Sequence, residues 1–224
     1  LSPYQIAMVH TRLGEPEAAL HWLRESARLC DFNYACVAVD PTFDGLHERG
    51  DFRQLLRDTG AALSPDSAFS VIQGIETLSL RIERHVQNTQ EIAEWLENHP
   101  DVASVNYSGL PSSPWYAAAN KYAPKGVGAV VSFELKGGVD AGRALVENVE
   151  LFSHLANIGD VRSLIIHPAS TTHSQLSPEQ QLTAGVTPGL VRLSVGIENV
   201  ADLKADLEAG FAAARTIAAA NAAK

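Results

Sequence analysis

The sequence predicts an α+β fold preceded by an α-helical hairpin. Apolar residues recur at helical spacing in residues 1–58, and thereafter short apolar runs alternate with helical stretches. The connections between these runs are too short for a doubly wound parallel sheet throughout. We therefore expect an antiparallel or mixed sheet that is covered on one side by helices.

The hairpin is predicted in residues 1–58, together with a tail. Apolar positions indicate one helix over 4–13 and a second over 17–29, with Gly14 at the break between them. The small and apolar residues that allow the two helices to approach closely are Ala19, Leu23 and Ser26. The segment resembles a tetratricopeptide-type repeat, of which one unit is visible. Because such a repeat cannot bury its apolar face alone, we expect a protein partner to be one possible occupant of that face.

Residues 59–66 are predicted to be a linker and residues 67–220 a second domain. A long helix is expected from Ser67 to Glu97, where Asn98-His99-Pro100 ends it. The abrupt change of pattern near Asp58 to Ser64 is typical of a join between two fragments. A chimeric or fragmentary chain is therefore one interpretation, and a natural multidomain protein is the other.

Short apolar runs predict the strands of the second domain. Strands are expected over 102–107, 128–135, 150–152, 162–166 and 190–195, and further helices over 140–148 and 200–218.

The acidic charge balance argues against two classes of partner. The chain has 224 residues, a formal net charge of −9 and a pI near 5.3, whereas nucleic acids and anionic membranes are bound by clustered Lys and Arg. No apolar stretch approaches the ~20 residues that span a bilayer, and no signal-peptide pattern opens the chain, so a cytoplasmic location is expected. Cys30 and Cys36 are too few for a disulfide framework and are predicted to be core thiols.

Arg192 is the first candidate functional residue. It is the single arginine of the apolar run from Leu190 to Gly196, and an unpaired buried guanidinium costs several kcal/mol. We therefore expect Arg192 to meet an anion, and a planar guanidinium suits a carboxylate. Small hydroxyls and histidines crowd around the short apolar strand within residues 157–173, which supports the same site. A salt bridge to an acidic neighbour within the protein is the alternative.

Several motifs in residues 60–215 are collinear with those of one enzyme family. They are Gln73 to Leu78, Asn106 to Pro114, Phe152 to Asp160, His167 to Gln175, Ala184 to Pro188 and Arg192 to Glu198. On these motifs the segment resembles the C-terminal domain of the O-acetylhomoserine sulfhydrylases, in the Cys/Met-metabolism family of pyridoxal-phosphate (PLP) enzymes. The resemblance implies the small domain of an aspartate-aminotransferase-like fold, PLP fold type I.

The resemblance also implies two substrate-binding residues. Arg192 would form a bidentate pair with the substrate α-carboxylate, and Ser163 would lie beside it. A plain hydroxyl at a strand end is the alternative for Ser163. His154, His167 and His173 lack metal-ligand spacing and are predicted to be structural, so no metal site and no catalytic residue are assigned.

The family's chemistry requires a lysine that forms a Schiff base with PLP, and a cradle for the PLP phosphate. The lysines of this chain are Lys121, Lys125, Lys136, Lys204 and Lys224. None of them has the Ser/Thr-Lys-x-x-x-Gly-His context that the resemblance implies, and no counterpart of the cradle is identified. We therefore expect that the chain alone does not hold PLP and is inactive.

Two functional hypotheses follow. In the first, the chain carries the substrate-carboxylate-binding domain of an O-acetylhomoserine sulfhydrylase, whose γ-replacement reaction gives homocysteine in methionine biosynthesis. In the second, it is a non-catalytic interaction or amino-acid-sensing module in which Arg192 and Ser163 hold an α-carboxylate. A small amino acid is the expected ligand in both, and a homo-oligomer is possible in both.

Overall fold

The computed structural model describes residues 1–60 and 64–222, so part of the predicted linker, residues 61–63, and Lys224 lie outside the described residues. Contacts between residues divide the chain into two units, Leu1–Gly74 and Ile75–Lys224. Within the described ranges, no helix has both the length and the apolar content needed to cross a membrane.

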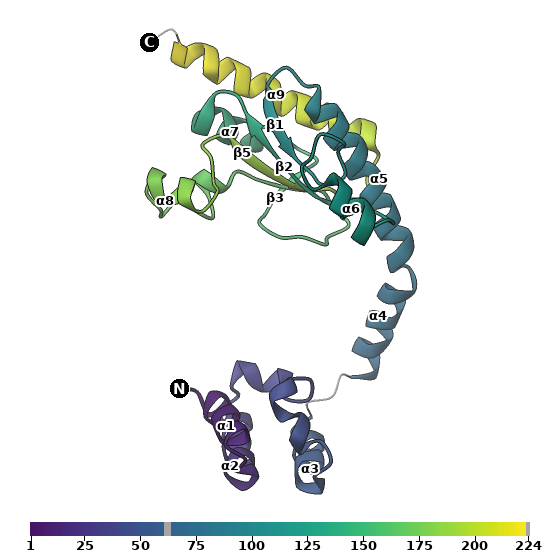
Figure 1. Cartoon of the computed structure of the whole chain (residues 1–224), viewed down its shortest axis with the longest axis vertical. Helices are drawn as coiled ribbons and strands as arrows, with labels where there is room; N and C mark the ends of the chain where they lie inside the picture. Colours follow the sequence, from purple (N-terminus) through teal and green to yellow (C-terminus); the bar gives the residue numbers. More distant parts are fainter. Residues whose placement is uncertain (61–63, 223–224) are drawn as a thin grey trace. The chain divides into compact units, whose positions relative to one another are not determined.

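The first unit contains the predicted helical hairpin (Figure 1). Its elements are α1 (Pro3–Arg12), α2 (Pro16–Arg28), the 3₁₀ helices η1 (Phe32–Cys36) and η2 (Pro41–Leu46), α3 (Gly50–Asp58) and most of α4 (Pro65–Glu76). Ser2 caps α1 through a reciprocal pair of hydrogen bonds with Gln5. The three residues predicted to allow close packing, Ala19, Leu23 and Ser26, are all fully buried.

The prediction for the two cysteines is wrong, because both side chains are exposed. Cys30 follows the end of α2 with a φ of 51°, and Cys36 is the last residue of η1. Both therefore lie in the turns that leave the hairpin, whereas the core of the first unit is built from aromatic and aliphatic side chains such as Phe43 and Phe52.

The second unit begins in a helix that is broken where the sequence predicts continuity. Instead of one helix over 67–97, α4 ends at Glu76 and α5 (Leu78–Glu97) follows, with Thr77 between them at φ −101° and ψ 2°. Gly74 and the β-branched Ile75 and Thr77 are poor helix formers, which accounts for the break at this point.

A five-stranded mixed sheet forms the centre of the second unit, as predicted. The remaining elements are β1 (Val102–Asn106), α6 (Tyr116–Tyr122), β2 (Val130–Leu135), α7 (Gly138–Glu147), β3 (Ser153–His154), β4 (Leu164–Ile166), η3 (Pro168–Ser170), α8 (Pro178–Thr183), β5 (Leu190–Ser194) and α9 (Val200–Ala222). The strand order is β1-β2-β5-β4-β3, and only the β3–β4 pair is parallel.

The strand predicted over 150–152 is wrong. The backbone N–H groups of Glu150, Leu151 and Phe152 donate to the Asp206 carboxylate of α9 at 2.8, 3.0 and 3.0 Å. Because these N–H groups donate to a carboxylate, they cannot form the backbone hydrogen bonds of a β-sheet. The strand forms immediately afterwards, as β3.

Helices α5, α7 and α9 cover one face of the sheet (Figure 1). Alternate strand residues point into this face and are almost fully buried: Val131, Phe133, Leu135, Ile165, Val191 and Leu193. They pack against Ile92 of α5, Leu145 of α7 and Phe211 of α9. The other face of the sheet is free of these helices, and the candidate site lies there.

Candidate functional site

Arg192 lies on the face of the sheet that the helices leave open. Its neighbours Val191 and Leu193 are fully buried in the core, so the two-residue period of a strand directs Arg192 to the opposite face. Arg192 is flanked by Ser132 of β2 and Ile166 of β4 in the strand register. The apolar neighbours of Arg192 therefore belong to the core-facing side of the strand. The arginine itself lies on the other side and is only partly buried.

The guanidinium of Arg192 has unused hydrogen-bonding capacity. Its Nη2 donates to the carbonyl of Asn157 at 3.2 Å, while its Nε–H is buried and has no partner among the described residues. No described Asp or Glu forms an ion pair with Arg192. A buried donor without an acceptor is costly, so this geometry favours an external anion over the alternative of an internal salt bridge.

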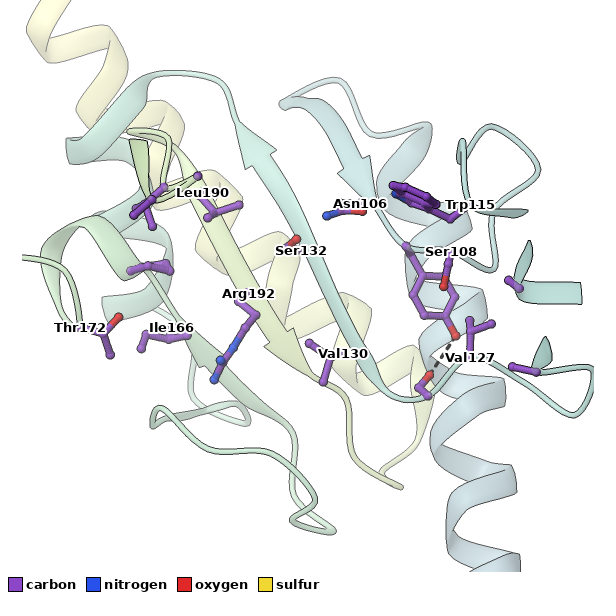
Figure 2. Close-up of a pocket in the computed structure, with 18 of the residues that line it drawn as sticks. Asn106, Ser108, Trp115, Val127, Val130, Ser132, Ile166, Thr172, Leu190 and Arg192 are labelled. Atoms are coloured by element: carbon purple, nitrogen blue, oxygen red, sulfur yellow. Dashed lines mark hydrogen bonds between the residues drawn. The ribbon is translucent and has the colours of Figure 1, made fainter. Parts of the chain in front are cut away.

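A cavity of about 920 Å³ opens beside Arg192 (Figure 2). The sheet forms its floor, and the segments around α6, η3 and α8 form its walls. The polar side chains that line it include Asn106, Ser108, Ser132, Thr172, His173 and Arg192. Arg192 is the one permanent charge among the lining residues described for this cavity, so the cavity is suited to a small anion with a polar or apolar body.

Tyr107 also lines the cavity. Its hydroxyl donates to the carbonyl of Gly128 at 2.9 Å, which ties β1 to the segment that enters β2 (Figure 2). Burial of the phenol raises the pKa of Tyr107 to about 12, so it stays neutral at physiological pH. Tyr107 therefore acts here as a fixed hydrogen-bond donor.

Ser163 is fully buried and does not line the cavity. Its backbone N–H donates to Glu198 Oε1 at 2.7 Å, and its hydroxyl donates to Glu198 Oε2 at 2.9 Å. The same hydroxyl oxygen accepts the N–H of Gly196 at 2.7 Å. All of these contacts are internal to the protein, and contact of Ser163 with a substrate stays a prediction.

The three histidines have different environments. His167 is fully buried, its Nε2 donates to the carbonyl of Pro188 at 2.8 Å, and its Nδ1 is 2.8 Å from the Ser170 hydroxyl. Desolvation lowers the pKa of His167, which agrees with the predicted structural role.

A structural role for His154 and His173 stays a prediction. His154 is exposed, and His173 lines the cavity with its Nδ1 2.9 Å from the Thr172 hydroxyl. No cluster of three His, Cys, Asp or Glu side chains that could hold a metal ion occurs in the part of the chain that the structure describes.

Sequence reasoning missed most of the cavity wall. Asn106 lies inside a motif that indicates only the family, and Ser132 and Trp115 carry no signal of their own. Thr172 and His173 lie in the 157–173 segment that supports the site, but the sequence does not single out either as a cavity residue. The spacing of Ser132 would have placed it on the open face, because it alternates with the buried Val131 and Phe133.

Comparison with known proteins identifies close relatives. O-acetyl-L-homoserine sulfhydrylase 1 of Thermus thermophilus is 50% identical over 200 residues, which cover 89% of this chain and 44% of the relative. The O-acetyl-L-homoserine sulfhydrylase of Corynebacterium glutamicum is 55% identical over 198 residues, which cover 88% of this chain and 42% of the relative. The chain thus spans less than half the length of these relatives.

A solved structure shows the same fold. The crystal structure of a putative O-acetylhomoserine (thiol)-lyase of Campylobacter jejuni, with N'-pyridoxyl-lysine-5'-monophosphate at its position 205, matches with a TM-score of 0.62 and 44% identity over 72% of this chain and 39% of that one. The family model for the Cys/Met-metabolism PLP-dependent enzymes matches residues 32–212, so the match begins within the segment predicted to belong to the hairpin domain. The chain therefore belongs to the Cys/Met-metabolism family of PLP-dependent enzymes.

Proposed function

We propose that the second unit binds the α-carboxylate of an amino-acid substrate, as part of an O-acetylhomoserine sulfhydrylase that makes homocysteine by γ-replacement. The observation that carries this proposal is the guanidinium of Arg192, which faces a cavity of about 920 Å³ with a buried, unpartnered Nε–H. The substrate class comes from relatives that are 50 and 55% identical to the chain.

Arg192 would orient the substrate through its carboxylate. An Nε–H and an Nη–H of one guanidinium form a planar fork that matches two carboxylate oxygens. The carbonyl of Asn157 already accepts a hydrogen bond from Nη2, so the guanidinium is oriented before a ligand binds. A charge-assisted hydrogen bond of this kind is worth about 1.5–3 kcal/mol.

The described residues around the cavity do not fit PLP by themselves. No lysine is among the residues that line it. Lys121 and Lys136 are exposed, with Lys121 lying over the Tyr122 ring and Lys136 donating to the carbonyl of Pro100, and Lys204 pairs with Glu91. We therefore assign no chemical step to this chain alone and expect it to be inactive alone.

Calorimetric titration with O-acetyl-L-homoserine tests the proposal. Wild-type chain should bind the amino acid weakly, and binding should disappear when the α-carboxylate is replaced by a carboxamide. Arg192→Gln should abolish binding, whereas Arg143→Gln, which removes an exposed arginine on α7, should leave it unchanged. Equal binding of acid and amide, or no binding by wild type, would refute the carboxylate site.

The non-catalytic alternative uses the same arginine. In a sensing or interaction module Arg192 holds a free amino acid, and the exposed side of the helical hairpin meets a protein partner. Spectrophotometric titration with PLP tests the expectation, common to both hypotheses, that the chain alone does not hold the cofactor. A visible absorption band that one lysine substitution removes would show that the chain holds the cofactor and would overturn the expected inactivity. A cytoplasmic location and a homo-oligomer remain predictions under either hypothesis.

A further inference from the structure

Glu198 is an acidic side chain close in sequence to Arg192 that takes no part in an ion pair within the described residues. Both of its carboxylate oxygens are instead occupied by Ser163, one by the backbone N–H at 2.7 Å and one by the hydroxyl at 2.9 Å. Two neutral donors of Ser163 thus hold the Glu198 carboxylate.

Ser163 lies at the end of a loop that accepts a hydrogen bond from Arg192. The loop leaves β3 and returns to β4, and its two ends are joined by a hydrogen bond from the Ser153 N–H to the Ser163 carbonyl at 2.9 Å. Its carbonyl at Asn157 is the acceptor for Arg192 Nη2. The position of that acceptor therefore depends on the anchor at Ser163.

The turn that follows β5 is held to the same anchor. The Ile197 N–H donates to the Val161 carbonyl at 3.0 Å, and the Gly196 N–H donates to the Ser163 hydroxyl at 2.7 Å. Gly196 leaves the space that this arrangement needs, because a Cβ there would collide with the Glu198 carboxylate and the Val161 carbonyl.

Helix α5 fixes the turn from the other side. His85 Nδ1 donates to the carbonyl of Val195 at 2.6 Å. Asn88 Nδ2 donates to the carbonyls of Gly196 and Glu198 at 3.0 and 2.8 Å. Hydrogen bonds from α5 thus fix the backbone of residues 195–198. The Glu198 side chain therefore has a fixed position, and the loop is attached to it through Ser163.

We propose that Glu198 and Ser163 are positioning residues of the carboxylate site: together they anchor the 155–162 loop so that the Asn157 carbonyl holds Arg192 with its Nε–H free for a ligand. This rests on the proposed function of Arg192 and gives Ser163 a role that needs no contact with substrate.

The test compares two carboxylates that bind backbone N–H groups. Glu198→Gln weakens the anchor at Ser163, whereas the control Asp206→Asn weakens the similar contacts at Glu150, Leu151 and Phe152, none of which lines the cavity. The first readout is the ¹⁵N NMR signal of Arg192 Nε–H in the full chain without ligand. The second is the affinity ratio between O-acetyl-L-homoserine and its carboxamide.

Glu198→Gln should shift the Arg192 Nε–H signal, speed its exchange with water and reduce the acid-over-amide ratio at least threefold. Asp206→Asn should lower the melting temperature but change neither readout. If Glu198→Gln does not fold, Ser163→Ala provides the same comparison, because it keeps the backbone N–H bond and removes the hydroxyl.

An unchanged Arg192 signal in the folded variant would overturn the positioning role, as would equal effects of the two variants. Failure of wild type to bind any amino acid would instead overturn the proposed function. The ligand-free NMR signal tests the positioning role in either case, so the two failures are distinguishable.

Discussion

The two faces of the sheet differ: one packs in the hydrophobic core, and the other lines the candidate binding cavity. On the inner face, Val191 and Leu193 are fully buried under α7 and α9. On the outer face, Ser132 and Arg192 line an open cavity. Because successive residues of a strand alternate between the faces, substitutions one residue apart should separate stability from ligand binding.

The largest effect is expected on the inner face. Phe211→Ala removes a fully buried ring that stacks on the His99 ring and lies beside the Phe133 ring. The distances between ring centroids are 4.0 and 5.9 Å, respectively. Truncation of such a ring costs about 3–5 kcal/mol of unfolding free energy. Urea denaturation would measure it, and Leu182→Ala on the exposed side of α8 should change the same quantity by less than about 0.5 kcal/mol. Similar losses in the two variants would break the comparison.

A substitution on the outer face should change the affinity for the ligand. Arg192→Lys keeps the charge but loses the planar fork, so affinity for O-acetyl-L-homoserine should fall about tenfold or more, from a loss of about 1.5–3 kcal/mol. The unfolding free energy should remain within about 0.5 kcal/mol of wild type. Calorimetry and urea denaturation of one preparation would check both. A large loss of stability would mean that Arg192 belongs to the scaffold.

A third substitution probes the place where α7 meets the cavity wall. A Cβ at Gly142 would lie 2.5 Å from Cδ2 and Nε2 of His167, whose ring supports the segment that leads to Thr172. Gly142→Ala should therefore cost about 1–3 kcal/mol of stability through overpacking. In thermal denaturation, Gly45→Ala is the control, since nothing lies within 4 Å of the added carbon. A wild-type melting temperature for Gly142→Ala would contradict the close packing of this helix.

The smallest effect is a pH dependence from His167. Burial lowers its pKa below the ordinary 6.5, so the unfolded chain binds this proton more readily than the folded one. The contribution of His167 to stability is therefore complete above about pH 6.5 and is lost as the pH falls through the lowered pKa. Unfolding free energies at pH 7.5, 6.5 and 5.5 should fall less steeply in His167→Gln than in wild type. Equal slopes would contradict the buried neutral imidazole.

Arg192 was predictable because one charge in an apolar run is conspicuous, and the strands around it were predictable because their apolar residues recur in short runs. The boundaries of β1, β2, β4 and β5 differ from the predicted ranges by one or two residues. The site itself depended less on local pattern than on the register that brings Ser132 and Ile166 beside Arg192.

Long-range contacts explain what the sequence did not show. The predicted strand over 150–152 is displaced because Asp206, more than fifty residues later, takes its N–H groups. Glu198 was visible only as the last residue of a motif, and its contact with Ser163 joins segments 35 residues apart. No local period or propensity encodes either contact.

A crystal structure of the chain grown with O-acetyl-L-homoserine tests the central claim most directly, namely that Arg192 on the open face of the sheet holds a substrate carboxylate. The account predicts the α-carboxylate within hydrogen-bonding distance of Arg192 Nε, with Glu198 still bound to Ser163. An Arg192 whose Nε–H is satisfied by a protein carboxylate, with the amino acid bound elsewhere, would contradict it.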